Sequence, residues 1–323
     1  MQLDEVAEIL AINVDAKPRP QYDPRRRFVN TARFFHKHSN LVSVLTSEAK
    51  GKQCQELRLA HLSVRDYLTS NRIICSPASY FNVTRLSAHK SIAEACIIYL
   101  QQFAGPDALD EEQPDAHALA RYAARFWSYH VRGATAAAKE RPSSGALMAS
   151  SDPRTTPLIL LILELLTEVL RLFGFSLPVS RGDSTEKDLS GDLNQLCVEL
   201  LCAPLHNQIR YFDPDTPWID KPDIARSIKA PASGLYYAAQ AGLTESVREL
   251  LAQGVDVNAV DGRYGTALQA ASCTGYRDII EILLENGADI NQLEGDYGNA
   301  LQGASCYGHE ECVKVLLDHG ADV

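Results

Sequence analysis

The residues that could form a catalytic triad lie in one short segment: His61, Ser63 and Asp66. In a hydrolase these side chains would act as base, nucleophile and orienting carboxylate, and they must converge in space beside an oxyanion hole. Here they fall on one predicted strand-to-helix turn, where Ser63 can cap a helix from Val64 to Asn71 with Asp66 at its third position. We therefore interpret this segment as a helix cap and expect no catalytic residues.

Thiol side chains could instead bind a metal ion. Cys197 and Cys202 lie five positions apart, and Cys306 and Cys312 lie six apart. Neither pair has the C-x₂₋₄-C spacing of a structural zinc site. The sequence therefore predicts no metal site, and these cysteines are expected to be thiols on helices.

A nucleotide cofactor would need a glycine-rich loop that holds phosphates, in the pattern G-x-x-x-x-G-K-[ST]. The chain has no such motif, since Gly51-Lys52 is followed by Gln53 and has no partner glycine upstream. We therefore expect no nucleotide-binding domain and no cofactor.

A repeat with a period of 33 residues organises residues 232–323. Leucine, glycine and aspartate recur at this interval as Leu235, Leu268 and Leu301, as Gly242, Gly275 and Gly308, as Gly254, Gly287 and Gly320, and as Asp256, Asp289 and Asp322. A period of roughly 20–50 residues is typical of stacked structural units rather than of one closed core.

The segment GTALQAASCTGYRDIIEILLENGADIN, from Gly265 to Asn291, resembles the ankyrin repeat. The resemblance implies three units, at about 232–261, 265–294 and 298–323, each a helix pair followed by an extended finger. Within the second unit, Gly287 is expected to supply the left-handed cap after the second helix. Each unit would contact only its neighbours, which creates a concave surface suited to binding.

The resemblance also implies which residues meet a partner, because proteins with such repeats bind through the finger tips and the exposed side of the first helices. At those positions stand Asp261, Arg263, Tyr264, Gln269, Cys273, Glu294, Asp296, Tyr297, Gln302 and Cys306. Large amphipathic rings are enriched at binding hot spots, which favours Tyr264 and Tyr297. Both tyrosines precede a glycine in the same register, so bracing of the fingers and recognition of a partner stay equal alternatives.

The third repeat stops at Val323, before the asparagine and finger that would complete it. A repeat array needs a capping unit with a polar outer face. We therefore expect a shortened descendant, or a truncated gene model, of a longer protein. Its last repeat would fray, be covered by a partner or self-associate.

The first part of the chain, residues 1–75, predicts a small α/β segment. Apolar residues at helical spacing predict a helix over 3–12. The segments 41–45 and 56–62 alternate at a two-residue period on either side of Lys50-Gly51, which predicts a β-hairpin.

Residues 57–70, LRLAHLSVRDYLTS, resemble a segment of fungal NACHT-type signalling ATPases that lies between the nucleotide-binding domain and ankyrin repeats. The resemblance covers about residues 1–105 and, more loosely, 119–127. It implies a winged-helix remnant over residues 1–75, in a chain without the ATPase.

The middle of the chain, residues 76–230, predicts an α-helical domain. Apolar faces predict helices over 87–104 and 189–202, and the small, polar composition near 134–155 predicts a flexible loop. The apolar run 158–173 is about as long as a membrane span needs, but three charged residues interrupt it. We expect the central helix of the domain there and no membrane span.

Charge is concentrated in the repeats. The whole chain has a net charge of −10, and residues 232–323 alone carry four basic and fourteen acidic side chains, also −10. Residues 1–52 carry a net charge of +3. An acidic array is repelled by phosphate backbones, so we expect no direct nucleic-acid binding.

Composition points to a globular protein in a reducing compartment. The apolar fraction of 46% and the charged fraction of 22% are ordinary, and the eight cysteines are too sparse for a disulfide framework. The N-terminal residues lack the basic region of a signal peptide. We expect an intracellular protein, cytoplasmic or nuclear.

These patterns together predict a mostly α protein: a helical middle domain and an ankyrin-repeat solenoid, preceded by the α/β segment. Such a protein would be a non-enzymatic adaptor or regulatory scaffold that docks one or more partner proteins, and a transcriptional coregulator is a plausible form of it. Two alternatives stay open. One is a severed part of an ATP-driven signalling receptor, and the other is an enzyme with an unrecognised site in the middle domain.

Overall fold

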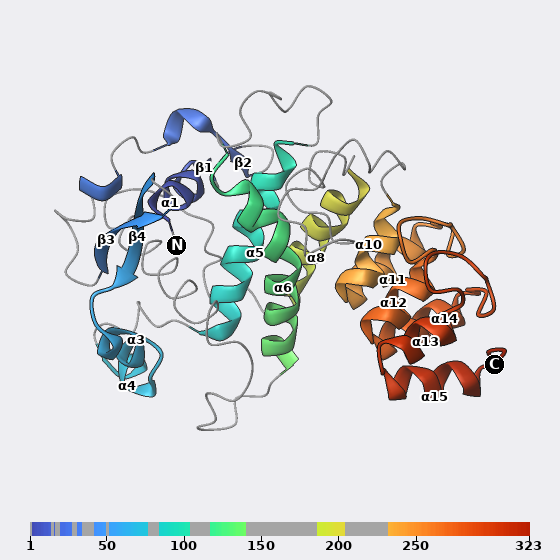
Figure 1. Cartoon of the computed structure of the whole chain (residues 1–323). Helices are drawn as coiled ribbons and strands as arrows, with labels where there is room; N and C mark the ends of the chain where they lie inside the picture. The colour runs from blue at the N-terminus through green and yellow to red at the C-terminus, as the bar shows by residue number, and fades with distance from the viewer. Residues whose placement is uncertain are drawn as a thin grey trace. The chain divides into compact units, whose positions relative to one another are not determined.

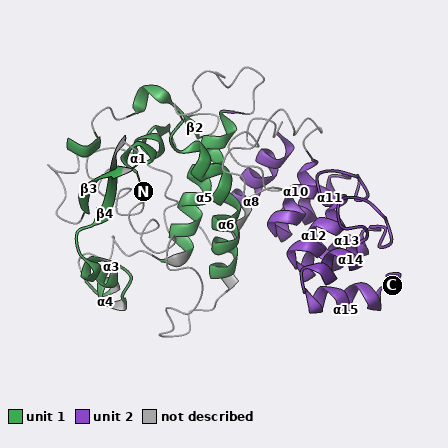
Figure 2. Cartoon of the chain, viewed as in Figure 1, with its two compact units in different colours: residues 1–102, 110–190 green, residues 103–109, 191–323 purple. Residues whose placement is uncertain are grey.

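The computed structural model describes residues 2–13, 16, 20–27, 31–33, 42–49, 52–76, 84–103, 117–139, 186–203 and 232–323. The described part is mostly helical, with two short two-stranded sheets (Figure 1). Two compact units are distinguished, one of residues 1–102 and 110–190 and one of residues 103–109 and 191–323 (Figure 2). The three-segment division expected from the sequence stays a prediction.

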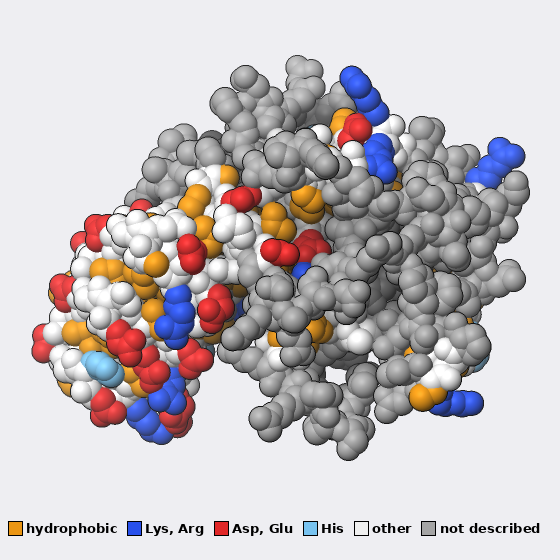
Figure 3. Space-filling view, turned by 180° about the vertical axis from the view of Figure 1, so that it is seen from behind, with side chains coloured by type: hydrophobic (Ala, Val, Ile, Leu, Met, Phe, Trp, Pro, Cys, Tyr) orange, Lys and Arg blue, Asp and Glu red, His pale blue; other side chains and the backbone are white. Residues whose placement is uncertain are grey.

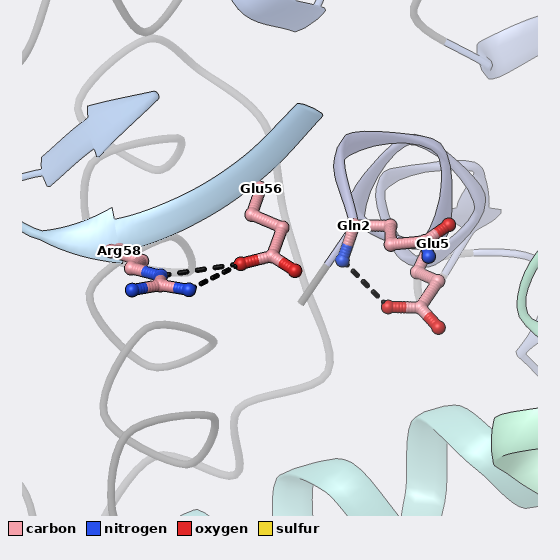
Figure 4. A network of polar contacts seen from close by, with 4 residues as sticks. All are labelled: Gln2, Glu5, Glu56 and Arg58. Atoms are coloured by element: carbon pink, nitrogen blue, oxygen red, sulfur yellow. Dashed lines mark hydrogen bonds and ion pairs between the residues drawn. The ribbon is translucent and has the colours of Figure 1, made fainter. Parts of the chain in front are cut away.

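The first unit begins with α1 (Leu3–Leu10), which confirms the expected N-terminal helix. Its start is attached to strand β4 (Lys52–Leu59) by a bridge between Gln2 and Glu56. The backbone N–H of Gln2 donates to the Glu5 carboxylate at 2.7 Å, and Arg58 forms an ion pair with Glu56 at 2.7 Å (Figure 4). Burial raises the pKa of Glu5. The Gln2–Glu56 bridge joins the helix to the hairpin, whereas the two side-chain contacts each lie within one of these elements.

The predicted hairpin is confirmed by β3 (Val42–Ala49), which pairs antiparallel with β4 from Val42–Leu59 to Ala49–Lys52. The bounds differ from the alternating segments, because pairing extends to Ala49 and Lys52 and β4 ends at Leu59, so the expected strand is wrong over 60–62. A second, smaller sheet joins β1 (Ile12–Asn13) and β2 (Gln21–Tyr22), and the 3-10 helix η1 (Pro24–Arg26) follows it.

The predicted helix cap after the hairpin is wrong in one respect. Helix α3 (Leu62–Leu68) already contains Ser63, so the capping position falls on His61. The ring nitrogen Nδ1 of His61 accepts from the Ser63 N–H at 3.1 Å and lies 2.8 Å from the Ser63 hydroxyl. An N-cap acceptor must precede the first helical residue, and here an imidazole takes that place. A short helix, α4 (Asn71–Ile74), follows.

Helices α5 (Arg85–Gln101) and α6 (Ala120–Lys139) pack along each other (Figure 1). They hold most of the buried apolar side chains among the described residues of the first unit. The loop predicted near 134–155 is wrong over 134–139, where α6 continues. Residues 134–139 read ATAAAK, and alanine is the strongest helix former. The small side chains that suggested a loop therefore extend the helix instead. Residues 140–155 and the apolar run 158–173 lie outside the described residues.

Within the described ranges, no helix is long and apolar enough to cross a membrane.

The second unit contains helix α8 (Glu186–Cys202) from residue 191 onward, followed by three helix pairs. The pairs are α10 (Gly234–Ala241) with α11 (Thr244–Ala252), α12 (Ala267–Thr274) with α13 (Arg277–Glu285), and α14 (Ala300–Cys306) with α15 (Glu310–Asp318). Each first helix packs on the next first helix, and each second helix on the next second helix (Figure 1). Each 33-residue repeat of the sequence thus corresponds to one helix pair in the stack.

Small and branched apolar residues hold the stack together. Ala270 and Ala271 of α12 are fully buried, as are Ile280 and Leu283 of α13. Small side chains on the first helices let neighbouring units approach closely. Gly275 ends α12 with a φ of 81°, a left-handed conformation that glycine adopts without steric cost.

Asparagine side chains bond one repeat to the next at the same interval. The Asn258 side chain accepts from the Asp289 N–H at 2.8 Å and donates to the Gly287 carbonyl at 3.2 Å. One repeat later, the Asn291 side chain accepts from the Asp322 N–H at 2.9 Å. These bonds fix the register of neighbouring units.

Candidate functional site

Two extended fingers project from the repeat stack, and each is closed by a backbone hydrogen bond. Asp261 N–H donates to the Gly265 carbonyl at 2.7 Å in the first finger, and Glu294 N–H to the Gly298 carbonyl at 3.3 Å in the second. The fingers are also joined to each other, because Asp296 N–H donates to the Arg263 carbonyl at 3.1 Å. Their side chains are therefore held on one continuous backbone support.

Tyr264 braces this support. Its side chain is buried, and its N–H donates to the hydroxyl of the fully buried Tyr236 at 3.1 Å. Its ring lies 5.8 Å from the ring of Tyr297, with an angle of 30° between the planes. Of the two alternatives for Tyr264, bracing of the finger and recognition of a partner, its burial favours bracing.

Tyr297 and Tyr307 continue the aromatic contact toward solvent. Their ring centroids are 5.3 Å apart, and the Tyr307 hydroxyl donates to the Tyr297 hydroxyl at 2.7 Å. Tyr297 is half-buried and Tyr307 is 43% exposed. Partial burial and the bond to Tyr297 raise the pKa of Tyr307. We call Tyr264, Tyr297 and Tyr307 the tyrosine cluster.

Tyr307 was absent from the residues that the sequence nominated. The equivalent positions in the earlier repeats are Thr274 and Ala241, so a large aromatic residue there departs from the repeat. That departure was the available signal.

Arg263 and Asp296 border the tyrosine cluster. Arg263 Nε lies 2.8 Å from an Asp296 carboxylate oxygen, and the guanidinium carbon lies 5.9 Å from the centre of the Tyr297 ring. The hydrogen bond to Asp296 raises the pKa of Arg263. A cation on an aromatic face within about 6 Å is attracted by the ring quadrupole.

The nominated residues on the first helices fall into two groups. Gln269 and Cys273 of α12 are buried, whereas Gln302 and Cys306 of α14 are exposed. Burial raises the pKa of the Cys273 thiol to about 12. Side chains inside the stack offer little surface to a partner, so of these four residues the exposed pair stays the candidate for contact with one.

The buried side-chain amide of Gln269 has hydrogen-bond partners for both its nitrogen and its oxygen. Its nitrogen donates to the carbonyls of Gln292 and Glu294 at 3.0 Å each and also to that of Gly298. Its oxygen accepts from the Thr266 N–H at 2.6 Å. Gln269 therefore holds the second finger in place.

Among the remaining nominated residues, Asp261 is half-buried and its carboxylate accepts from the Ser233 N–H at 3.1 Å. Glu294 and Asp296 are exposed at the second finger tip. Acidic side chains predominate over basic ones on the repeat face seen in Figure 3, with apolar side chains between them. The candidate site is thus aromatic at its centre and acidic at its border.

A different polar cluster lies between α5 and α6 of the first unit. His130 Nδ1 lies 3.2 Å from His89 Nδ1, and His130 Nε2 lies 2.9 Å from the Tyr122 hydroxyl. Both imidazoles are 2% exposed, and burial lowers the pKa of His130 to about 3. The ring nitrogens of His130 face other side chains of the protein, so the cluster joins the two helices.

Among the described residues, no group of three or more histidine, cysteine, aspartate or glutamate side chains could hold a metal ion.

The family match agrees with the helix pairs of the second unit. Residues 234–323 match the model of ankyrin repeats in three copies. The solved human ASB11 ankyrin repeat domain is 38% identical, over 28% of this chain and 41% of that chain, with a TM-score of 0.27.

A longer match extends beyond the repeats. The azaphilone pigments biosynthesis cluster protein L of Monascus ruber is 29% identical over 284 residues, which are 85% of this chain and 50% of the relative. This chain therefore spans half the length of that relative. For the second unit, helix pairs, fingers, interrepeat bonds and family match coincide: residues 234–323 form an array of three ankyrin repeats.

Proposed function

We propose that this chain is a non-enzymatic adaptor that docks a partner protein on the tyrosine cluster and the neighbouring finger tips. The observation that carries the proposal is the exposed edge of the cluster, where Tyr297 and Tyr307 are locked together by a hydroxyl bond of 2.7 Å. Rigid aromatic side chains lose little conformational freedom on binding and dominate many interfaces.

The way the fingers are fixed supports binding rather than chemistry. Gln269 and the backbone bond between Asp296 and Arg263 hold the cluster before any partner arrives. A pre-organised surface spends less of its interaction energy on ordering itself. By contrast, the titratable cluster around His130 is buried, which suits a structural role.

A more specific proposal is regulation of gene expression, with the chain acting as a coregulator that meets a DNA-bound protein inside the cell. Its support is the acidic charge of the repeats, which favours a protein over a phosphate backbone. The name of the Monascus relative, which refers to a pigment biosynthesis cluster, is compatible with such a role. Microscopy of the tagged protein tests it, and strict exclusion from the nucleus would contradict it.

The order of β3, β4 and α3 supports one alternative, that the chain works beside a separate nucleotide-binding chain as part of an ATP-driven switch. The sequence that carries the resemblance, residues 57–70, spans the end of β4 and α3. Affinity capture with this chain as bait, followed by mass spectrometry, separates the proposals, because the switch requires a nucleotide-binding chain among the captured partners and a plain adaptor does not.

The main proposal is tested by affinity capture with the full chain as bait. We expect the Tyr297→Ala/Tyr307→Ala variant to lose captured partner at least tenfold relative to wild type. The matched control is Tyr67→Ala, because Tyr67 on α3 is 41% exposed, similar to Tyr307, but belongs to the other unit. Equal recovery of every partner by the double variant and the control would show that the docking surface lies elsewhere.

A further inference from the structure

The side chain of Arg263 already places a cation against the tyrosine cluster. Its guanidinium carbon lies 5.9 Å from the Tyr297 ring centre, while Nε bonds to Asp296 at 2.8 Å. Tyr264 is close enough to raise the pKa of Arg263, as Tyr297 and Asp296 also do. The chain itself thus shows which chemical group fits this patch: a planar cation between aromatic rings and a carboxylate.

The contacts that hold Arg263 are exposed. The Asp296 side chain is 59% exposed and that of Arg263 is 27% exposed. An exposed ion pair and an exposed cation–π contact each change an equilibrium by only about two- to fivefold. Arg263 can therefore leave this position without a large change in stability.

The surroundings favour an incoming cation. Residues 232–323 carry a net charge of −10, and Glu294 is exposed at the same finger tip as Asp296. Such a field attracts a basic segment and orients it on approach. An arginine fits better than a lysine because its planar guanidinium stacks on a ring and bonds a carboxylate at the same time.

We propose that the tyrosine cluster recognises an arginine side chain of the partner protein, and that Arg263 is an internal occupant which this arginine displaces. The inference rests on the proposed docking function and adds the chemistry of the partner. After displacement, the partner's guanidinium lies on the Tyr297 ring and pairs with Asp296, and Arg263 turns to solvent. The free protein thereby weakens its own binding of basic segments that lack a well-placed arginine.

The test uses the full chain and two fluorescent probes of equal charge, octa-arginine and octa-lysine, followed by anisotropy at constant salt. Wild type is expected to bind octa-arginine roughly three- to tenfold more tightly than octa-lysine, by the combined size of the contacts above. Tyr297→Ala is expected to abolish this preference. Equal affinity of wild type for the two peptides would overturn the proposal.

The displacement step has its own variant and matched control. Arg263→Met removes the internal cation but keeps an apolar stem, and Arg277→Met removes the same charge from α13, where Arg277 pairs with Glu281 at 2.8 Å. We expect Arg263→Met to bind octa-arginine about three- to fivefold more tightly than Arg277→Met, because only the first vacates the ring. Equal affinities would mean that Arg263 does not compete and would overturn the displacement.

These outcomes are distinct from failure of docking itself. If affinity capture depends on Tyr297 and Tyr307 while wild type binds both peptides equally, the docking surface stands and its preference for arginine is refuted. Should Arg263→Met fail to fold, the comparison of the two peptides on wild type and Tyr297→Ala still decides the matter.

Discussion

The second and third repeats carry the same residues at two positions of their first helices, yet these side chains differ in burial. Gln269 is buried and Gln302 is exposed, although each helps to cap the start of its helix. Cys273 is buried and Cys306 is exposed. The difference shows that in this stack the neighbouring unit, rather than the residue type, decides what a side chain does.

The neighbour that matters is the following repeat. The finger that leads into it covers Gln269, and its Gly303 lies so near Cys273 that an added Cβ would come within 2.7 Å of the sulfur. Its His309 ring lies beside Gly275 and is bonded to the Cys273 carbonyl at 3.0 Å. Within residues 232–323, the third repeat has no such cover.

The largest expected effect separates the two glutamines. Gln269→Ala removes an amide that bonds three carbonyls and one N–H, so we expect it to lower stability by about 3 kcal/mol. Gln302→Ala removes its bond to the Asn299 N–H at 3.2 Å, with an expected loss of about 1 kcal/mol. Amide hydrogen exchange in α12 and α14 measures both local free energies. Equal losses would refute the view that the next finger sets the role of this position.

A smaller difference is expected between two turn glycines with the same backbone. Gly275 has a φ of 81° and Gly308 a φ of 74°, but an added Cβ would lie 2.6 Å from His309 at the first and meet open space at the second. Alanine at either position costs about 1 kcal/mol for the left-handed conformation. We expect Gly275→Ala to cost about 1 kcal/mol more, because His309 must move.

Thermal unfolding of the two glycine variants, monitored by circular dichroism, measures this difference. A variant with both Gly275→Ala and His309→Ala provides the control, since removal of the ring should reduce the additional loss. If the clash is irrelevant, the two glycine variants unfold at the same temperature.

The smallest disturbance of the fold is expected in a comparison of two cysteines by chemical labelling, which needs no substitution. We expect iodoacetamide at pH 8 to modify Cys306 at least tenfold faster than Cys273, because Cys273 is 4% exposed and burial raises its pKa to about 12. The exposed Cys75 and Cys202 serve as internal references in the same chain. Peptide mass spectrometry follows all four thiols. Similar rates for Cys273 and Cys306 would mean that the stack opens readily.

The repeat architecture was predictable because its causes are local and periodic. Apolar spacing places the helices, and glycines such as Gly287, with a φ of 86°, terminate units because only glycine adopts that conformation without steric cost. The hairpin β3–β4 was likewise predictable from alternation around a turn. The helix boundary at Leu62 was missed by two residues, which moved the cap from Ser63 to His61.

The candidate site could be predicted only in part. The finger positions followed from the repeat, so Arg263, Asp296 and Tyr297 were nominated and lie together. For Tyr264 the sequence left bracing and recognition as equal alternatives, and it did not point to Tyr307 at all. The role of each tyrosine depends on which aromatic ring packs against it in the folded protein, and the 33-residue period does not give that contact.

The sequence by itself determined that residues 232–323 form stacked units, that their surface is acidic, and where each helix pair lies. Periodicity, charge and backbone preference are properties of the chain read in order. Only the tertiary structure decided which of two identical glutamines holds a finger, which of two identical cysteines is reachable, and that Arg263 rests on the Tyr297 ring. The physical reason is that burial and pairing belong to the contact between repeats, where residues far apart in sequence exclude water from each other.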